Sequence, residues 1–214
     1  MVQEAQGVLV IACGALAHDI AALRRANQWL QMDVSCLPPE LHNRPGKIPG
    51  AVRAQIHAAR GRYQSIFVAY GDCGTGGALD RVLEEEGIER IPGAHCYEFL
   101  ATSAVFERLT EAEIGTFYLT DFLLLHFERL VIRGLALDRH PELLPTYFGN
   151  YRKLVYLSQS LSPGAEDRAR AIAVHLGLSY EHCQTGHGTL GSSLAAAMRR
   201  HEGARPEGAI AWAR

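Results

Sequence analysis

The chain has 214 residues, of which 48% are hydrophobic and 21% charged, and its formal net charge is −2. This balance is typical of a globular domain with enough apolar residues for a core. It argues against a dedicated nucleic-acid-binding protein, because affinity for phosphates needs a concentrated basic surface. No apolar run approaches the roughly 20 residues that span a bilayer, and the first residues lack the basic segment of a signal peptide. We therefore expect a cytoplasmic protein that binds neither membranes nor nucleic acids.

Short apolar runs alternate with segments of helical period along the chain, which is the pattern of a parallel α/β sheet. Strands are expected at residues 8–12, 32–37, 65–70, 88–91, 153–157, 178–182 and 209–212. Helices are expected at about 18–31, 49–60, 78–86, 162–176 and 191–200, and Gly61, Gly87 and Gly177 follow three of them as stop signals.

Residues 96–150 depart from this alternation. Two helices are expected there, at about 96–109 and 120–133, the second with Thr120 as its N-cap. We therefore predict a single α/β domain over residues 1–214. It would be a three-layer sandwich with a mostly parallel, Rossmann-like open sheet and a helical insertion around 96–150.

Cysteines follow the first four predicted strands, and this placement is the most informative feature of the sequence. They are Cys13, Cys36, Cys73 and Cys96. Because the C-terminal ends of parallel strands share one edge of a sheet, where ligands bind, these thiols can converge in space. Thiolates and imidazoles are preferred ligands of Zn²⁺, and thiolates also hold iron–sulfur clusters. Other potential ligands accompany them, namely His18, His42, His95 and, after the sixth strand, His182, Cys183 and His187.

The alternative for each cysteine is a structural role, since free cysteine behaves as a small buried hydrophobe. Cys36 lies within an apolar run and fits that role. Cys13 and Cys73 lie in glycine turns, where bare backbone leaves a side chain accessible, and Cys96 follows His95 after a Pro-Gly break. No C-x-x-C pair is present, which argues against a zinc ribbon or a thioredoxin-like site. The odd number of cysteines, five, argues against a disulfide framework.

Two glycine-rich turns are candidates for binding an anion. The first, residues 71–77, lies between a strand and a helix, where successive N–H groups bind anions and lower the pKa of a nearby thiol. The second, residues 186–191, matches G-x-G-x-x-G but lacks the acidic residue that a dinucleotide site needs. For both, a turn without a ligand is the alternative. The candidate cofactor-binding residues are Gly71, Gly74, Gly76, Gly186 and Gly188.

Three polar residues in the inserted region would close over the strand ends. They are Tyr118, Asp121 and Tyr147, and a structural role is the alternative for each. No G-x-S-x-G elbow is present, so the triad of an α/β-hydrolase is not expected.

Several of these segments match the pattern of a known family. The chain resembles domain-of-unknown-function family 1638 in Ala12-Cys13-Gly14, Leu41-His42, Tyr70-Gly71-Asp72-Cys73-Gly74, Ile91-Pro92 with His95-Cys96, and Gly115-Thr116-Phe117-Tyr118-Leu119-Thr120. The resemblance covers residues 8–160. It implies that Cys13, Cys73 and Cys96 form one site.

The same resemblance implies a class of chemistry. Members of the family occur in bacteria and archaea, often near genes for corrinoid-dependent methyl transfer. The chain departs from the family pattern in the segment 92–96. Gly93 follows Pro92 where members often carry arginine, and His95 and Cys96 are adjacent where members often have an aspartate between them. We therefore expect a different geometry there.

We expect an enzyme whose Zn²⁺ is held by Cys13, Cys73 and Cys96, with His42, His95 or water as the fourth ligand. Three thiolates on zinc favour activation of a substrate thiol over polarisation of a carbonyl. Methyl or alkyl transfer to or from a thiol or a corrinoid fits that chemistry. His95, His42 and Tyr118 are the candidate catalytic residues, and the glycine turns would bind an anionic part of a small-molecule substrate.

Two other classes of function remain open from the sequence. The first is a non-catalytic carrier of a metal, an iron–sulfur cluster or a corrinoid that serves a partner enzyme. The second is a metal-free enzyme in which Cys73 is the nucleophile, activated by the helix N-terminus, with His95 or His187 as the base.

Overall fold

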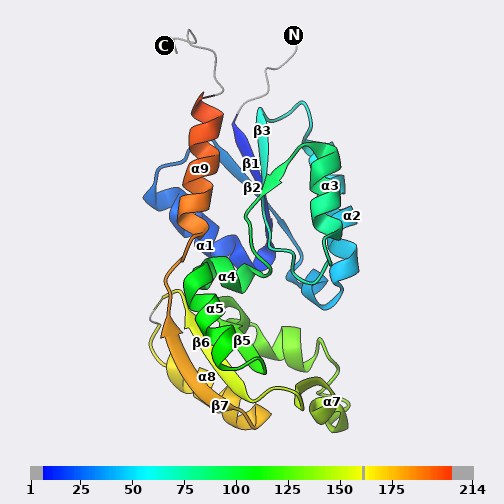
Figure 1. Ribbon diagram of the computed structural model, residues 1–214, viewed down its shortest axis with the longest axis vertical. Coiled ribbons are helices and arrows are strands. Elements are labelled where there is room, and N and C mark those ends of the chain that lie inside the picture. The colour runs from blue at the N-terminus through cyan, green and yellow to red at the C-terminus, as the bar shows by residue number, and fades with distance from the viewer. Residues whose placement is uncertain (1–6, 161, 204–214) are drawn as a thin grey trace.

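The computed structural model describes residues 7–160 and 162–203, in which parallel strands form two sheets (Figure 1). The first sheet has the order β2-β1-β3-β4 and contains β1 (Val8–Cys13), β2 (Met32–Leu37), β3 (Ser65–Ala69) and β4 (Glu89–Arg90). All six residues of β1, which pairs with both β2 and β3, are buried. Burial on both faces explains the continuously apolar sequence of this strand.

Helices cover both faces of the first sheet and give the predicted three-layer, Rossmann-like arrangement. α1 (Ala17–Ala26) and α9 (Leu190–Gly203) lie together on one face (Figure 1). α2 (Ile48–Ala59) and α3 (Ala78–Glu86) lie together on the other. Gly87 ends α3 in a left-handed conformation, as the sequence predicted. We call this sheet and its four helices the first lobe.

The second sheet has the order β5-β6-β7 and contains β5 (Thr116–Thr120), β6 (Lys153–Ser158) and β7 (Ser179–Gln184). One face packs against α6 (Asp121–Leu125) and α8 (Ala165–Leu176), and the other against α5 (Ser103–Ala112). A π-helical turn (Glu128–Ile132) and α7 (Leu144–Phe148) extend the core of the first of these faces. This sheet and these helices form the second lobe. α4 (Cys96–Ala101) joins the lobes, because its residues contribute to both cores.

The division into two sheets is the main difference from the single sheet expected from the sequence. β4 has only two residues, and Pro92 follows it closely. Proline has no N–H to continue a ladder of hydrogen bonds. The region predicted as a helical insertion contains β5, the first strand of the second sheet, and its helices are shorter than predicted. Thr120 caps α6 as predicted, accepting a hydrogen bond from the N–H of Leu123.

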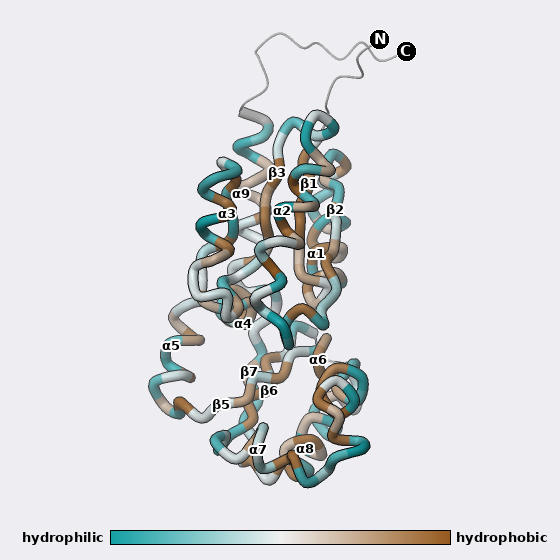
Figure 2. The backbone as a smooth tube through the Cα atoms, turned by 90° about the vertical axis from the view of Figure 1, so that its right-hand side faces the viewer, coloured by the Kyte–Doolittle hydropathy of each residue, from teal (hydrophilic) through white to brown (hydrophobic). Residues whose placement is uncertain are grey.

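The C-terminal ends of strands from both sheets face the space between the lobes. Cys13, at the end of β1, and Thr120, at the end of β5, line the same cavity. After β7 the chain returns from the second lobe to the first, where it forms α9 (Figure 1). Figure 2 shows apolar residues along β1 and β3 and polar residues on the outer turns of α3.

Within residues 7–160 and 162–203, no helix is both long and apolar enough to cross a membrane. The strand expected at 209–212 lies outside the described residues.

Candidate functional site

The turn that follows β3 brings Cys73 next to Cys96. Cys73 adopts a left-handed conformation (φ +49°), and its N–H donates to the carbonyl of Ala94 at 2.8 Å. Gly71 permits this close approach, because a Cβ at that position would lie 2.8–2.9 Å from the backbone of His95. The Sγ atoms of Cys73 and Cys96 are consequently 3.4 Å apart. This separation is far longer than a disulfide bond of about 2.0 Å.

Cys73 is the thiol of this pair that carries the negative charge. Its pKa is held well below the usual range by its hydrogen bond with Cys96 and by the imidazoles of His42 and His95. The pKa of Cys96 is raised by the same hydrogen bond and by burial, and the Cys73 thiolate raises the pKa of His95. The two sulfurs therefore share one proton, beside an imidazole that is stabilised in its charged form.

Cys13 is a buried, protonated thiol at the end of β1. Burial raises the pKa of Cys13 to about 11, and the hydroxyl of Tyr70 and the thiol of Cys73 are close enough to affect it. Neither the Tyr70 hydroxyl nor Nδ1 of His95, both buried, completes a hydrogen bond of ordinary geometry in the described part of the chain. Buried polar atoms without partners are uncommon and point to a ligand or a water at this site.

A cavity of about 260 Å³ adjoins these residues between the two lobes. Cys13, His42 and Cys96 contribute to its wall from the first lobe and from the start of α4. The second lobe contributes apolar and aromatic side chains, among them Phe117, Phe122, Leu123, Tyr147, Phe148 and Tyr151. Cys96 is thus the member of the thiol pair that lines the cavity. Cys73 lies behind Cys96 and His42, the two lining residues with which it interacts. We call Cys13, Cys73, Cys96, His42 and His95 the thiol cluster.

The thiol cluster contains the predicted metal ligands but does not surround a vacant position. Two sulfurs on a tetrahedral Zn²⁺, with Zn–S bonds of about 2.3 Å, lie roughly 3.8 Å apart. Cys73 and Cys96, at 3.4 Å, are close to that separation. Among the residues that the structure describes, however, no three His, Cys, Asp or Glu side chains are placed to hold one ion. The potential ligands Cys96, His42 and His95 surround the Cys73 sulfur instead. A third ligand side chain would therefore have to rotate before it could share an ion with Cys73 and Cys96.

The predicted anion site at the first glycine turn is filled by a side chain of the protein. The carboxylate of Asp72 accepts hydrogen bonds from the N–H groups of Gly76 at 3.1 Å and Gly77 at 2.9 Å, and from the Thr75 hydroxyl. These bonds lower the pKa of Asp72. Gly76 therefore donates to the chain itself in this structure, and the role of Gly71 is to admit the His95 backbone. Gly74, in a left-handed conformation, lies against Pro45.

The second glycine turn is packed against α4. A Cβ at Gly188 would overlap the carbonyl oxygens of Phe99 and Leu100, and the N–H of Thr189 donates to the carbonyl of Phe99 at 2.7 Å. Gly186 precedes it in a left-handed conformation. This packing fixes the position of His187, which lies at a second cavity and not in the thiol cluster.

Tyr118, predicted to be catalytic, lies outside the wall of the thiol-cluster cavity. Its hydroxyl is 3.1 Å from that of Thr110, and its ring contacts Tyr97 and Phe106. Tyr147 lines the cavity, whereas Asp121 lies in the second cavity.

The remaining cysteines are not part of the cluster. Cys36 is exposed, so the prediction of a buried packing residue is wrong. Its strand lies at the edge of the sheet, where alternate side chains face solvent. His182 and Cys183 lie within β7 of the second sheet and do not follow a strand end, because β7 extends to Gln184. The imidazole of His182 is 2.8 Å from the hydroxyl of Ser158.

Sequence reasoning missed three aromatic residues of the site. Tyr70 faces Cys13, Tyr97 contacts both imidazoles of the cluster, and Phe122 lines the cavity. Each is adjacent to a residue already singled out, namely Gly71, Cys96 and Asp121. Adjacency in sequence to a candidate residue is the signal that could have identified them.

The chain belongs to the family described as "Protein of unknown function (DUF1638)", whose profile matches residues 36–194. This match confirms the resemblance noted in the sequence. The matched region contains His42, Cys73, His95 and Cys96 but begins after Cys13. Comparisons with curated proteins and with solved structures gave no match.

Proposed function

We propose that this protein is a cytoplasmic, thiolate-dependent enzyme whose thiol cluster binds Zn²⁺ next to a small apolar cavity. The observation that carries the proposal is the 3.4 Å separation of the Cys73 and Cys96 sulfurs, with the imidazoles of His42 and His95 close enough to lower the pKa of Cys73. Thiolates and neutral imidazoles are the ligands that zinc prefers. Cys13, at the wall of the same cavity, is the further thiol ligand that the sequence predicts.

Bound zinc would supply one thing, the stabilisation of a substrate thiol as a nucleophilic thiolate. The chain's own residues hold and move the protons. Cys13 and Cys96 have raised pKa values, so they are protonated in the metal-free protein and release protons when a cation binds. His95, which the Cys73 thiolate stabilises in its charged form, would likewise have to release its proton before its imidazole could bind the cation.

The cavity restricts the reacting group to a small, weakly polar one. Its volume of about 260 Å³ lies below the roughly 300–1,000 Å³ of sites for drug-sized ligands. Its aromatic and aliphatic walls exclude water and fit a methyl or short alkyl group. We therefore propose methyl or alkyl transfer to or from a small thiol. In the forward direction the sulfur–carbon bond forms as the carbon's bond to its carrier breaks, and the carrier keeps the electron pair.

A corrinoid is the alternative carrier in this proposal. The cavity is too small to enclose one, so a partner enzyme would have to present it at the opening between the lobes.

A second candidate function is supported by the backbone at Cys73. This residue lies at a sharp turn between a strand and a helix with φ +49°, a conformation that non-glycine residues adopt rarely and that often marks a functional position. Its neighbours hold it as a thiolate without any metal. The second candidate is therefore a metal-free enzyme with a cysteine nucleophile and His95 as its proton carrier.

Metal analysis separates the two candidates. Wild-type protein, purified without oxygen and without an affinity tag, should contain about one zinc per chain. Cys73→Ala and Cys96→Ala should lose it, whereas Cys183→Ala, which removes a partly buried thiol in the second sheet, should keep it. Wild-type protein that neither contains nor takes up zinc would overturn the first candidate. Iron with sulfide would show a cluster carrier instead.

Alkylation with iodoacetamide tests the thiolate itself in metal-free protein. Cys73 is buried and should react slowly, but its rate should change little between pH 6 and pH 8, because its pKa lies below this range. Cys36 is an internal control. It is exposed and its pKa is raised, so it should react slowly at pH 6 and faster at pH 8. A Cys73 rate that rises with pH in parallel with that of Cys36 would refute the second candidate.

A further inference from the structure

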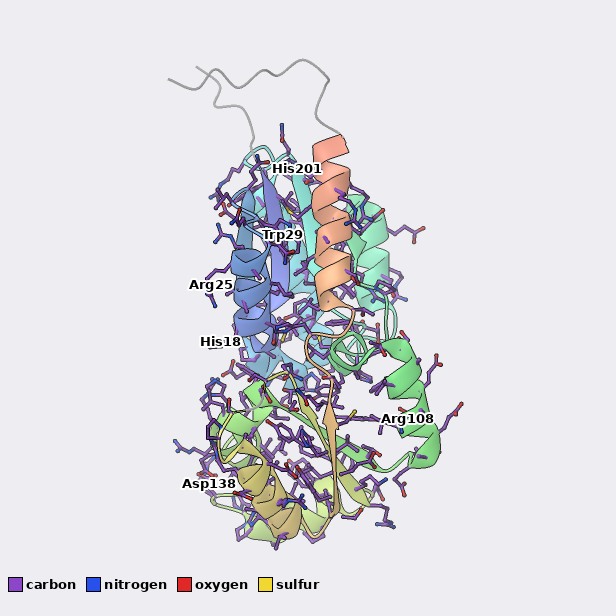
Figure 3. All side chains as sticks on the ribbon, turned by 90° about the vertical axis from the view of Figure 1, so that its left-hand side faces the viewer. His18, Arg25, Trp29, Arg108, Asp138 and His201 are labelled. Carbon is purple, nitrogen blue, oxygen red and sulfur yellow. The ribbon has the colours of Figure 1, made fainter. Side chains whose placement is uncertain are left out.

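A second, larger cavity with charged residues in its wall lies between the lobes, next to the thiol-cluster cavity. Its volume is about 550 Å³, and Phe122 lines both it and the thiol-cluster cavity. α1 provides one wall, and α6, α8 and the segment after β6 provide the other. Figure 3 labels two of the α1 residues, His18 and Arg25, with His18 next to the second lobe. The lining residues with a carboxylate, guanidinium or imidazole side chain are His18, Asp19, Arg25, Asp121, Arg168 and His187.

The carboxylates of this polar cavity already have partners. Asp121 accepts hydrogen bonds from the Tyr156 hydroxyl at 2.6 Å, from the Ser160 N–H at 2.8 Å and from the Ser160 hydroxyl at 2.9 Å. The Oδ1 of Asp19 lies 3.0 Å from Nδ1 of His187. Both negative charges are therefore engaged by the protein itself.

The guanidinium groups differ from the carboxylates in this respect. Arg168 donates to the carbonyl of Leu124 at 3.3 Å. Within the described ranges, neither Arg168 nor Arg25 forms an ion pair with a carboxylate. The carboxylate oxygens are thus occupied by donors of the protein, whereas guanidinium N–H groups from both lobes have no carboxylate partner among the described residues and are left for a ligand. Guanidinium groups bind carboxylate and phosphate oxygens in a bidentate geometry.

His187 is oriented toward this cavity by Asp19. The Asp19 side chain is only 13% exposed. Burial raises the pKa of Asp19, and the neighbouring imidazole opposes this effect. A carboxylate that accepts Nδ1–H fixes the orientation of an imidazole and leaves Nε2 as the proton acceptor. The packing of the 186–189 turn against α4 holds His187 in this position.

We propose that the polar cavity binds a small molecule through an anionic group, a carboxylate or a phosphate, held by Arg25 and Arg168. The Asp19–His187 pair accepts a proton from the bound molecule at Nε2, and the Asp19 carboxylate stabilises the imidazolium that forms. This site does not depend on the thiol cluster, because none of its charged residues belongs to that cluster.

The test is a titration with inorganic phosphate and, separately, with acetate, followed by the NMR signals of the histidine rings. The signals of His187 should shift saturably with at least one of the two anions, and the comparison shows which anion the site takes. Arg168→Gln should weaken binding at least tenfold. Arg170→Gln is the matched control, because Arg170 lies on the same helix, pairs with Glu166 and does not line the cavity. It should bind as wild type does.

Two further variants guard against a folding artefact. Arg25→Gln removes the second guanidinium from the other lobe and should weaken binding as Arg168→Gln does. Asp19→Asn should retain anion binding but change the ring ¹⁵N shifts of His187, since the acceptor for Nδ1–H is altered. The absence of any His187 shift at saturating anion, or equal effects of Arg168→Gln and Arg170→Gln, would overturn the proposal. Zinc content measured on the same samples reports on the thiol cluster independently.

Discussion

Replacement of Gly71 by alanine is expected to separate the two sulfurs of the thiol cluster without removing any of its side chains. The new Cβ would lie 2.8 Å from the carbonyl carbon of His95, 2.9 Å from its Cα and 3.1 Å from the backbone nitrogen of Cys96. Carbon atoms pack at about 3.5–4.0 Å, so the 95–96 segment has to move by roughly 0.5–1 Å. These are backbone atoms, and no side-chain rotation can relieve the overlap.

Gly71→Ala should lower the folding stability moderately but change the thiol cluster strongly. Overpacking of this kind costs about 1–3 kcal/mol, which lowers the melting temperature of a chain of this size by roughly 2–12 °C. The hydrogen bond with Cys96 is the largest cause of the low pKa of Cys73. When Cys96 moves away, the pKa of Cys73 should rise and zinc should be lost.

Two measurements check this prediction, the zinc content and the pH dependence of Cys73 alkylation. Gly50→Ala is the matched control, because nothing lies within 4 Å of a Cβ at Gly50, in α2. Alanine there should stabilise the helix by up to about 1 kcal/mol and leave the thiols unchanged. If Gly71→Ala keeps the wild-type alkylation profile and zinc content, the close approach at Gly71 does not determine the properties of Cys73.

Two other substitutions give further predictions. Cys13 should contribute about 2–3 kcal/mol to the fall in folding stability between pH 9 and 11, because its thiol ionises near 9.0 in the unfolded chain and stays protonated up to about 11 in the folded one. Denaturant unfolding of Cys13→Ala should show a smaller fall, and an unchanged one would contradict the assignment. Gly188→Ala, at φ +47° against Phe99 and Leu100, should cost about 1–3 kcal/mol and abolish the His187 shift with phosphate. Its Cys73 alkylation should match wild type, and a change there would show that the two cavities are coupled.

The strand and helix order and the meeting of Cys73 with Cys96 could be predicted from the sequence because they follow from local rules. Hydrophobic period identifies strands and helices, glycine ends helices, and the C-terminal ends of parallel strands share an edge. Cys73 and Cys96 meet for that last reason. None of these rules needs knowledge of which sheet a strand joins.

The division into two sheets and the position of Tyr118 outside the cavity wall depend on contacts distant in sequence. The sequence pattern did not identify β5 as a strand, so it could not show which residues face the cavity. Side chains on a strand alternate between faces. Phe117 therefore lines the cavity, whereas its neighbour Tyr118 faces α5. The filling of the first glycine turn by Asp72 depends likewise on the folded backbone, since it requires N–H groups that converge only there.

The two cavities fit one substrate better than either does alone. An anionic group is poorly placed beside the Cys73 thiolate and the aromatic walls, because like charges repel and an apolar wall cannot replace water around a charge. In the polar cavity, the guanidinium groups of Arg25 and Arg168 can take the place of the water around an anionic group. Since Phe122 lines both spaces, a molecule with its anionic end in the polar cavity can extend past this ring to the thiol cluster. The anionic substrate expected from the sequence would then be held between α1 and α8, and its apolar end would be the part that reacts.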